Sequence, residues 1–313
     1  MLCRRGNELY LAVGIIAALL FLMFGPRNYA LLQLGGPKPL SWETPVANKT
    51  AMKCVKVNAK PEPYTVCPHN DKKRSDGISG FILSGFQWEV WISNKITEYY
   101  KRYPKSTLVD IGAHIGSHSL HAAAMGLPVV AAEPNPDNIP NIHQAVLLNR
   151  FQSLYTLLPY GISDVRTTLN MTKNPKNLGA TRIFRGLVGK PFDDSDPATP
   201  FFIRTILLDD LIPFIKTETV FLKVDVESHE CRVIRSGKKF FKKFFVPLIF
   251  TEMVIAHKAE PECVKGMVNF FRDKGYKARD TEHFTNLTLP APDASADKFA
   301  TPYWPLDVTW YLP

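Results

Sequence analysis

The sequence predicts an α/β fold built on a mostly parallel sheet with helices on both faces, and three observations support it. Short apolar segments alternate with amphipathic ones from Thr107 onward, which is typical of parallel sheets covered by helices. A glycine-containing turn, residues 110–116, follows the first of these segments. Acidic residues stand at the ends of later segments, at the edge where open α/β sheets bind ligands.

The elements of this fold follow from hydrophobic periodicity. Strands are expected at residues 107–111, 129–132, 154–158, 221–224 and 248–251. Helices are expected within 81–100 and at 117–125, 137–148, 230–239 and 261–274. Residues 166–212 interrupt the alternation, with a Pro- and Asp-rich loop at 191–200, and predict an antiparallel insertion on the ligand side. Residues 307–312 are interpreted as the last strand of a seven-stranded sheet.

The N-terminus predicts a transmembrane helix before this fold. Residues 9–24 carry no charge, and Arg4 and Arg5 precede them; a helix of this length is short against the ~20 residues that cross an average bilayer. A cleaved signal peptide is the alternative, but its apolar region usually has about 7 to 15 residues and no A-x-A-like site follows here. The two arginines favour a cytosolic N-terminus and a lumenal body.

The expected protein is therefore a single-pass type II membrane protein of the secretory pathway, with the Golgi as the expected organelle. A region rich in proline and glycine after the anchor suggests a stem. The expected parts are a cytosolic tail (1–8), a signal anchor (9–25), a stem (26–75) and a globular domain (76–313).

Cysteines and sequons agree with a lumenal body. A disulfide between Cys54 and Cys67 is expected in an oxidising lumen, whereas Cys231 and Cys263 are interpreted as unreactive core residues. Glycosylation sequons begin at Asn48, Asn170 and Asn286.

Neither a nucleic-acid partner nor a metal site is expected. The net charge is +9, but the basic residues are scattered and are not interleaved with aromatic residues. His114, His118 and His121 lie close together in sequence, yet no Cys, Asp or Glu completes a ligand set.

The turn after the first strand has the features of a nucleotide-type site. It bends at Gly112 and enters a helix after Gly116, so backbone N–H groups and a helix N-terminus face a ligand. The dinucleotide fingerprint G-x-G-x-x-G is incomplete here. A nicotinamide oxidoreductase is therefore disfavoured.

Further polar residues follow the next strands. Glu133 ends the second strand, about 20 residues after the glycine turn, where a carboxylate can accept both hydroxyls of a ribose. Asp164 follows the third strand and is placed to face an adenine amino group. Asp225, Glu227 and His229 follow the fourth strand and complete the candidate site.

Four motifs in this order closely resemble those of the FkbM-type methyltransferases. They are DIGAHIGSH (110–118), EPNP (133–136), SD (163–164) and LKVDVESHE (222–230), and the resemblance runs from about residue 107 to the C-terminus. The family usually has Asn where His114 stands and Gly where Ser228 stands.

The resemblance implies a class I, Rossmann-like methyltransferase fold, S-adenosylmethionine as cofactor and O-methylation of a hydroxyl. Carried over by motif, the cofactor would be bound by Asp110, Gly112 and Gly116 (methionine and ribose end), Glu133 (ribose), Asp164 (adenine) and Asp225 (beside the methyl group). A hydroxyl acceptor must lose a proton, and His229 is the first candidate for the base, followed by Glu227 and Asp225.

The expected acceptor is a glycan or another hydroxyl-bearing molecule of the secretory pathway, by analogy with other type II enzymes. The alternative function is a binding or trafficking protein that keeps the fold without turnover, and His114 and Ser228 leave it open. The oligomeric state is not predicted.

Overall fold

The computed structural model of the chain describes residues 36–43, 52–70, 77–172, 182–183, 201–253, 260–299 and 304–313. The chain divides into two units, Met1–Lys38 and Pro39–Pro313, and the fold below is that of the second. The expected anchor at 9–25, the sequon at Asn48 and the loop at 191–200 lie outside the described residues. Among the helices that are described, none has the length and apolar character needed to cross a bilayer.

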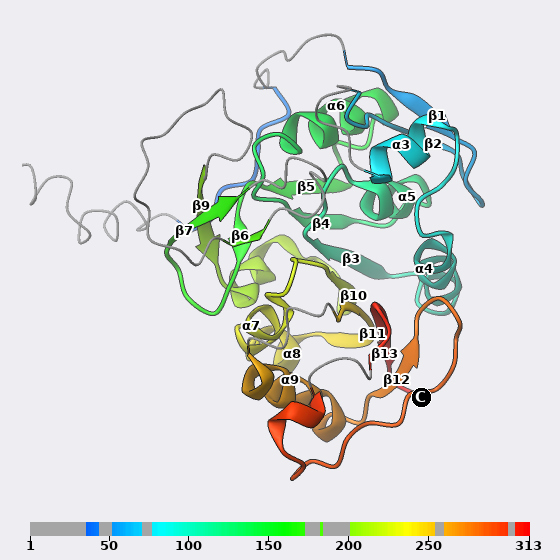
Figure 1. The fold of residues 1–313 in the computed structure, drawn as a ribbon. Coiled ribbons are helices and arrows are strands. Elements are labelled where there is room, and N and C mark those ends of the chain that lie inside the picture. Colours follow the sequence, from blue (N-terminus) through cyan, green and yellow to red (C-terminus); the bar gives the residue numbers. More distant parts are fainter. Residues whose placement is uncertain are drawn as a thin grey trace, which may run out of the picture. The chain divides into compact units, whose positions relative to one another are not determined.

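A mostly parallel sheet forms the centre of the second unit (Figure 1). Its order within the described residues is β12-β13-β11-β10-β3-β4-β5, and β13 alone runs opposite to the other strands, antiparallel to both β11 and β12. The strands are β3 (Ser106–Ile111), β4 (Val129–Ala132), β5 (Tyr155–Leu158), β10 (Thr219–Val224), β11 (Phe245–Glu252), β12 (Lys277–Asp280) and β13 (Asp307–Tyr311). The predicted number of seven strands is confirmed, and six of them lie at predicted positions; β12 has no counterpart among the predicted ranges.

Helices cover both faces of this sheet, as predicted. On one face, Leu108 and Phe221 belong to the same apolar cluster as residues of α4 (Val90–Arg102), α5 (Ser117–Ala124) and α6 (Ile139–Asn149). On the other face, Val109 and Leu222 share a cluster with residues of α7 (Glu230–Arg235), α8 (Phe240–Lys243), α9 (Pro261–Asp273), η2 (Leu208–Phe214) and η4 (Ala296–Phe299). Successive side chains of a strand point to opposite faces, so each strand feeds both clusters.

The predicted insertion forms a second, smaller sheet of order β6-β9-β7-β8. Its strands are β6 (Gly161–Ile162), β7 (Thr168–Thr172), β8 (Arg182–Ile183) and β9 (Phe201–Ile206). β7 pairs antiparallel with β8 and β9, and β6 pairs parallel with β9. The expected antiparallel character is therefore confirmed for most of this sheet.

The interpretation of residues 26–75 as a stem is wrong for residues 52–68. These residues form a hairpin of β1 (Val55–Val57) and β2 (Tyr64–Val66), whose apolar side chains are buried in the same cluster as α5 and α6. The Asn149 side chain on α6 bonds both backbone groups of Thr65, at 2.8 and 2.7 Å. The proline-rich composition of this segment predicts no strands, and the contacts with α6 that stabilise the hairpin join residues distant in sequence.

Two further predictions of elements need correction. The helix expected at 230–239 ends at Arg235. Gly237, which follows it, packs closely on Leu208, where a Cβ would lie 2.6 Å from the leucine side chain. The helix expected within 81–100 is two helices, α3 (Gly77–Leu83) and α4.

All four cysteines in the described residues are paired. Cys54–Cys67 is confirmed as a disulfide. The interpretation of Cys231 and Cys263 as unreactive core residues is wrong, since they form a second disulfide that joins α7 to α9.

We expect the Cys231–Cys263 bond to contribute to stability mainly by constraining the unfolded chain. For its sequence separation of 32, the loop-entropy relation gives about 3 to 4 kcal/mol. The Cys231→Ser/Cys263→Ser double variant should lower the denaturation midpoint accordingly, measured beside the matched Cys54→Ser/Cys67→Ser variant. An unchanged midpoint would contradict a stabilising role.

Candidate functional site

A cavity of about 330 Å³ lies at the carboxyl edge of the large sheet. β3, β4, β10 and β11 contribute residues at or just beyond their carboxyl ends, and the smaller sheet closes one side through Met171 and Ile203. The cavity spans the point where strand order reverses between β3 and β10. Such switch points are where open α/β sheets bind ligands.

Gly112 joins the two halves of this edge. Its φ is +78°, and a Cβ placed on it would lie 1.8 Å from the carbonyl oxygen of Asp225. The Gly112 N–H donates to Ala132 O at 2.9 Å, and the Asp225 N–H donates to Ile111 O at 3.0 Å. A side chain at this position would separate the ends of β3 and β10, so glycine is required for both conformation and space.

Glu133 is a buried carboxylate held by three donors. Its Oε2 accepts the His114 N–H at 2.7 Å, and its Oε1 accepts the Asn135 N–H at 2.8 Å and the Asn138 Nδ2 at 3.2 Å. Burial raises the pKa of Glu133, and these donors and His114 only partly oppose the rise. The side chain is thus fixed, and of its about four lone-pair sites one, on Oε2, stays available to a ligand.

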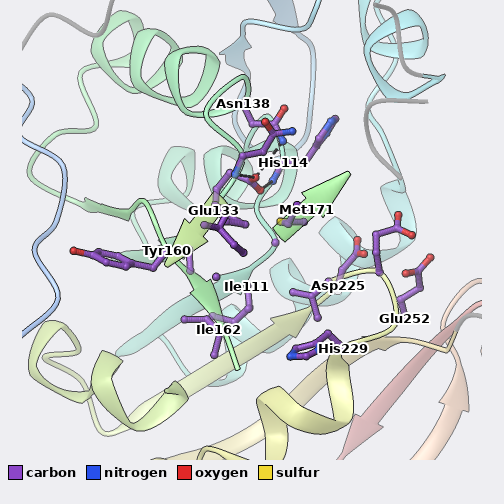
Figure 2. A pocket seen from close by; sticks show the side chains of 18 of the residues that line it. Ile111, His114, Glu133, Asn138, Tyr160, Ile162, Met171, Asp225, His229 and Glu252 are labelled. Atoms are coloured by element: carbon purple, nitrogen blue, oxygen red, sulfur yellow. Dashed lines mark hydrogen bonds between the residues drawn. The ribbon is translucent and has the colours of Figure 1, made fainter. Parts of the chain in front are cut away.

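His114 and Asn138 form the rim beside Glu133. His114 has φ +52°, and its ring centroid lies 6.0 Å from that of His69. The His69 Nε2 is 2.9 Å from Asn138 Oδ1. In Figure 2, His114, Glu133 and Asn138 stand together on one side of the cavity.

Apolar side chains line the part of the cavity nearest β5 and the small sheet. Tyr160, Ile162, Met171 and Ile203 are all less than 10% exposed overall and belong to the lining. A flat, weakly polar group fits between such side chains better than a charged one.

The opposite part of the cavity carries ionisable groups (Figure 2). Asp225, Glu227, His229 and Glu252 all line it. The His229 Nε2 lies 2.8 Å from Ser163 Oγ, which fixes the imidazole plane. Glu227 has φ +54°, a conformation that is uncommon outside glycine.

Lys223 neutralises two carboxylates below this ionisable end. Its Nζ lies 3.0 Å from Asp225 Oδ2 and 3.7 Å from Asp110 Oδ1. Burial alone would lower the pKa of Lys223, but Asp225 and Asp110 reverse this effect and raise it. Lys223 therefore stays charged and orients Asp225.

Sequence reasoning missed Lys223 and Glu252. Burial, together with Asp225, Glu227, Glu230 and Asp307, raises the pKa of Glu252 far above its usual range, so its carboxyl is protonated at neutral pH. The available signal was the one used for Glu133, an acid at the end of an expected strand. Lys223 gave no signal because a lysine inside a strand usually faces solvent.

The cavity gathers five of the eight predicted site residues. Those that line it are Gly112, Glu133, Asp225, Glu227 and His229. Asp110 lies below it against Lys223, and Gly116 is the N-cap of α5 with φ +84°. The structure does not bring Asp164 to the cavity, because its carboxylate pairs with Arg232, at 3.4 Å, and Arg235 on α7.

Groups that resemble metal ligands are engaged elsewhere. The ligand atoms of Cys231, Glu260 and Cys263 lie within 4.8 Å of one another, but the two sulfurs are bonded to each other. His118 and His121 make close polar contacts with side chains of α4.

Glu230 gives the fold a pH dependence. Its side chain is fully buried, and Oε1 accepts the Val226 and Ser228 N–H groups at 3.0 and 3.1 Å. Burial raises its pKa to about 8. Because the folded state then binds more protons than the unfolded state, the contribution of Glu230 is fully present below about pH 4.5 and is lost as pH rises through 8.

We expect Glu230→Gln to remove this contribution. Its free energy of unfolding, relative to that of the natural chain, should increase between pH 5 and 8 in denaturant titrations. Glu262→Gln, at an exposed glutamate of α9, is the matched control and should show no such trend. Parallel pH profiles for the Glu230 variant and the natural chain would contradict the assignment.

Comparison with known proteins gives one match to a family. A sequence profile described as the methyltransferase FkbM domain matches residues 110–278. No curated protein sequence matches the chain.

Solved structures align only loosely. A precorrin-6y C5,15-methyltransferase from Geobacter metallireducens aligns with TM-score 0.32 and 13% identity over 67% of this chain and 80% of its own. A putative methyltransferase from Streptococcus mutans, in complex with SAH, aligns with TM-score 0.36 and 7% identity over 66% and 88%. A SAM-dependent methyltransferase from Agrobacterium tumefaciens aligns with TM-score 0.35 and 9% identity over 75% and 65%.

Proposed function

Since the chain belongs to the FkbM family of S-adenosylmethionine-dependent methyltransferases, we propose that it methylates a hydroxyl oxygen of a glycan in the lumen of the secretory pathway. The observation that carries the proposal is the cavity itself, with a fixed carboxylate at one end and an acid–base group at the other.

The residues present fit S-adenosylmethionine. Gly112 leaves room where a Cβ would close the edge between β3 and β10, and Glu133 offers a rigid acceptor for a ribose hydroxyl. The apolar part around Tyr160, Ile162 and Met171 suits the adenine face. We assign the adenine to these side chains in place of Asp164, which pairs with α7.

The cofactor supplies a methyl group bonded to a positively charged sulfur. As the new O–CH₃ bond forms, the S–CH₃ bond breaks, its electron pair stays on sulfur, and the acceptor hydroxyl gives up its proton. His229 is the proposed base, because it lines the cavity and Ser163 fixes its ring. Asp225 is held by Lys223 and would position the acceptor, and Glu227 is the next candidate for the proton.

Several features support a lumenal glycan enzyme. Two disulfides suit an oxidising compartment, and the sequon at Asn286 stands on an exposed segment, with Arg279 bonded to its side chain. The uncharged run at 9–24 after Arg4 and Arg5 supports a type II anchor. Sugar hydroxyls are the abundant acceptors in that compartment.

The departures from the family pattern are compatible with activity. His114 and Ser228 stand where the family usually has Asn and Gly, and their φ values are +52° and +79°. Asn and Gly are the residues that tolerate this region best. The backbone thus keeps the shape that the family residues favour, so neither departure argues against activity.

The proposal is tested by incubating the full-length protein with methyl-labelled S-adenosylmethionine and a panel of glycans. We expect label in a glycan, and His229→Ala should lower turnover by about 10² to 10⁴ with nearly unchanged cofactor affinity by calorimetry. His283→Ala, at an exposed histidine, is the control. Cofactor binding without label transfer to any hydroxyl would select the binding protein, and full activity of His229→Ala would move the base to Glu227.

The location has its own test. In sealed microsomes, added protease should spare the body behind its anchor, and glycosidase should increase its gel mobility. Digestion of the body in intact vesicles would contradict a lumenal enzyme.

A further inference from the structure

Three residues on α3 and just before α4 form a wall of the cavity that lies outside the matched family domain. Ile78 on α3, and Trp88 and Glu89 just before α4, line the cavity, whereas the family match begins at residue 110. This wall therefore adds to the cavity something other than the family motifs, and its residues are an indole ring and a carboxylate.

Glu89 is held in an unusual position. Its φ is +39°, in the left-handed region. This conformation costs an ordinary residue of order 1 to 3 kcal/mol, so it persists only where the surrounding structure enforces it. Glu89 is the N-cap of α4 but makes no capping hydrogen bond with its side chain. Its Oε2 instead lies 3.0 Å from His118 Nε2, and His118 Nδ1 is 3.5 Å from Ser93 Oγ. The carboxylate is thus oriented by a buried histidine and kept at the cavity.

Trp88 extends the cavity into an aromatic surface. Its ring packs edge-on against Phe81 with centroids 5.7 Å apart, and Phe81 lies 5.3 Å from Phe86. Phe81 is 42% exposed and Phe86 is 59% exposed. Apolar side chains that stay exposed beside a cavity commonly mark a binding surface.

The charges of the cavity restrict what binds beside this wall. Among the described residues that line it, none is lysine or arginine, whereas Glu89, Asp225 and Glu227 are acidic, and Lys223 below the cavity offsets Asp225. An anionic acceptor would therefore be repelled. Burial keeps the carboxyl of Glu252 protonated, so the same end offers hydrogen-bond acceptors and one donor. Hydroxyl groups need both, because each donates and accepts.

We propose that Trp88 and Glu89 form the acceptor subsite and that it takes an uncharged sugar. The indole would pack against the C–H face of a pyranose ring, and the Glu89 carboxylate would accept its hydroxyl protons. The inference rests on the proposed glycan methylation and names the part of the chain that recognises the glycan. A cationic amine, which also suits an indole and carboxylates, is the alternative that the test must separate.

The test measures binding and not turnover. Saturation-transfer NMR is recorded on the full-length protein with saturating S-adenosylhomocysteine and one probe at a time: the methyl glycosides of mannose, galactose and N-acetylglucosamine, then glucuronate and glucosamine. At least one neutral glycoside should bind about 10-fold more tightly than either charged sugar. Trp88→Leu and Glu89→Gln should each weaken that binding about 10-fold and leave S-adenosylhomocysteine affinity within about twofold by calorimetry.

Two variants serve as matched controls. Glu98→Gln changes an exposed glutamate of α4 that pairs with Lys95, and Phe245→Leu changes an exposed aromatic ring at the start of β11, remote from the cavity. Neither should alter sugar binding. If Trp88→Leu also loses S-adenosylhomocysteine affinity, Glu89→Gln, which preserves side-chain shape, decides the question.

Each outcome has one meaning. Unaltered sugar binding in Glu89→Gln, preference for glucosamine or glucuronate, or no binding of any neutral glycoside would overturn the inference. Sugar binding that depends on Glu89, found in a protein that transfers no methyl group, would support the subsite and reject the methylation. Normal methylation of a glycan by both variants would support the proposed methylation and reject the subsite.

Discussion

The close approach of Gly112 to the Asp225 backbone is the constraint on which the site depends. It allows the backbones at the ends of β3 and β10 to lie so close that a Cβ on Gly112 would be 1.8 Å from the Asp225 carbonyl oxygen. The turn after Gly112 then presents the His114 N–H to Glu133, while the loop between β10 and α7 presents Asp225 and the residues up to His229. One missing side chain thus sets the distance between the carboxylate end and the acid–base end of the cavity.

A second constraint is the handling of charge at this edge. Carboxylates gather there from several strands, and burial makes their simultaneous ionisation unfavourable. Two features reduce this repulsion. Lys223 stays charged between Asp110 and Asp225. Glu252 and Asp307 hold protons, because burial and acidic neighbours raise the pKa of both, that of Asp307 to about 8. Asp225 is consequently a fixed carboxylate beside neutral acids, an arrangement that keeps its orientation.

The sequence predicted the parallel strands and the motif residues because both depend on local pattern. A short apolar run bounded by turn residues, such as residues 129–132, favours a buried strand, and Gly112 marks its own turn. The β12 strand (Lys277–Asp280) was missed because an edge strand needs little apolar character. The pairing of Cys231 with Cys263, the ion pair of Asp164 with Arg235, and the place of Glu89 depend on contacts between elements distant in sequence. The hydrophobic pattern of a sequence does not predict such contacts.

The wall formed by Ile78, Trp88 and Glu89 separates two properties along the chain. The residues proposed to hold the cofactor lie within the family domain, and the proposed acceptor wall precedes it. On that proposal, variation in the upstream segment would redirect the enzyme to a new acceptor while the machinery for methyl transfer stays intact. Specificity and chemistry are inherited on different stretches of one polypeptide, and selection can act on either one alone.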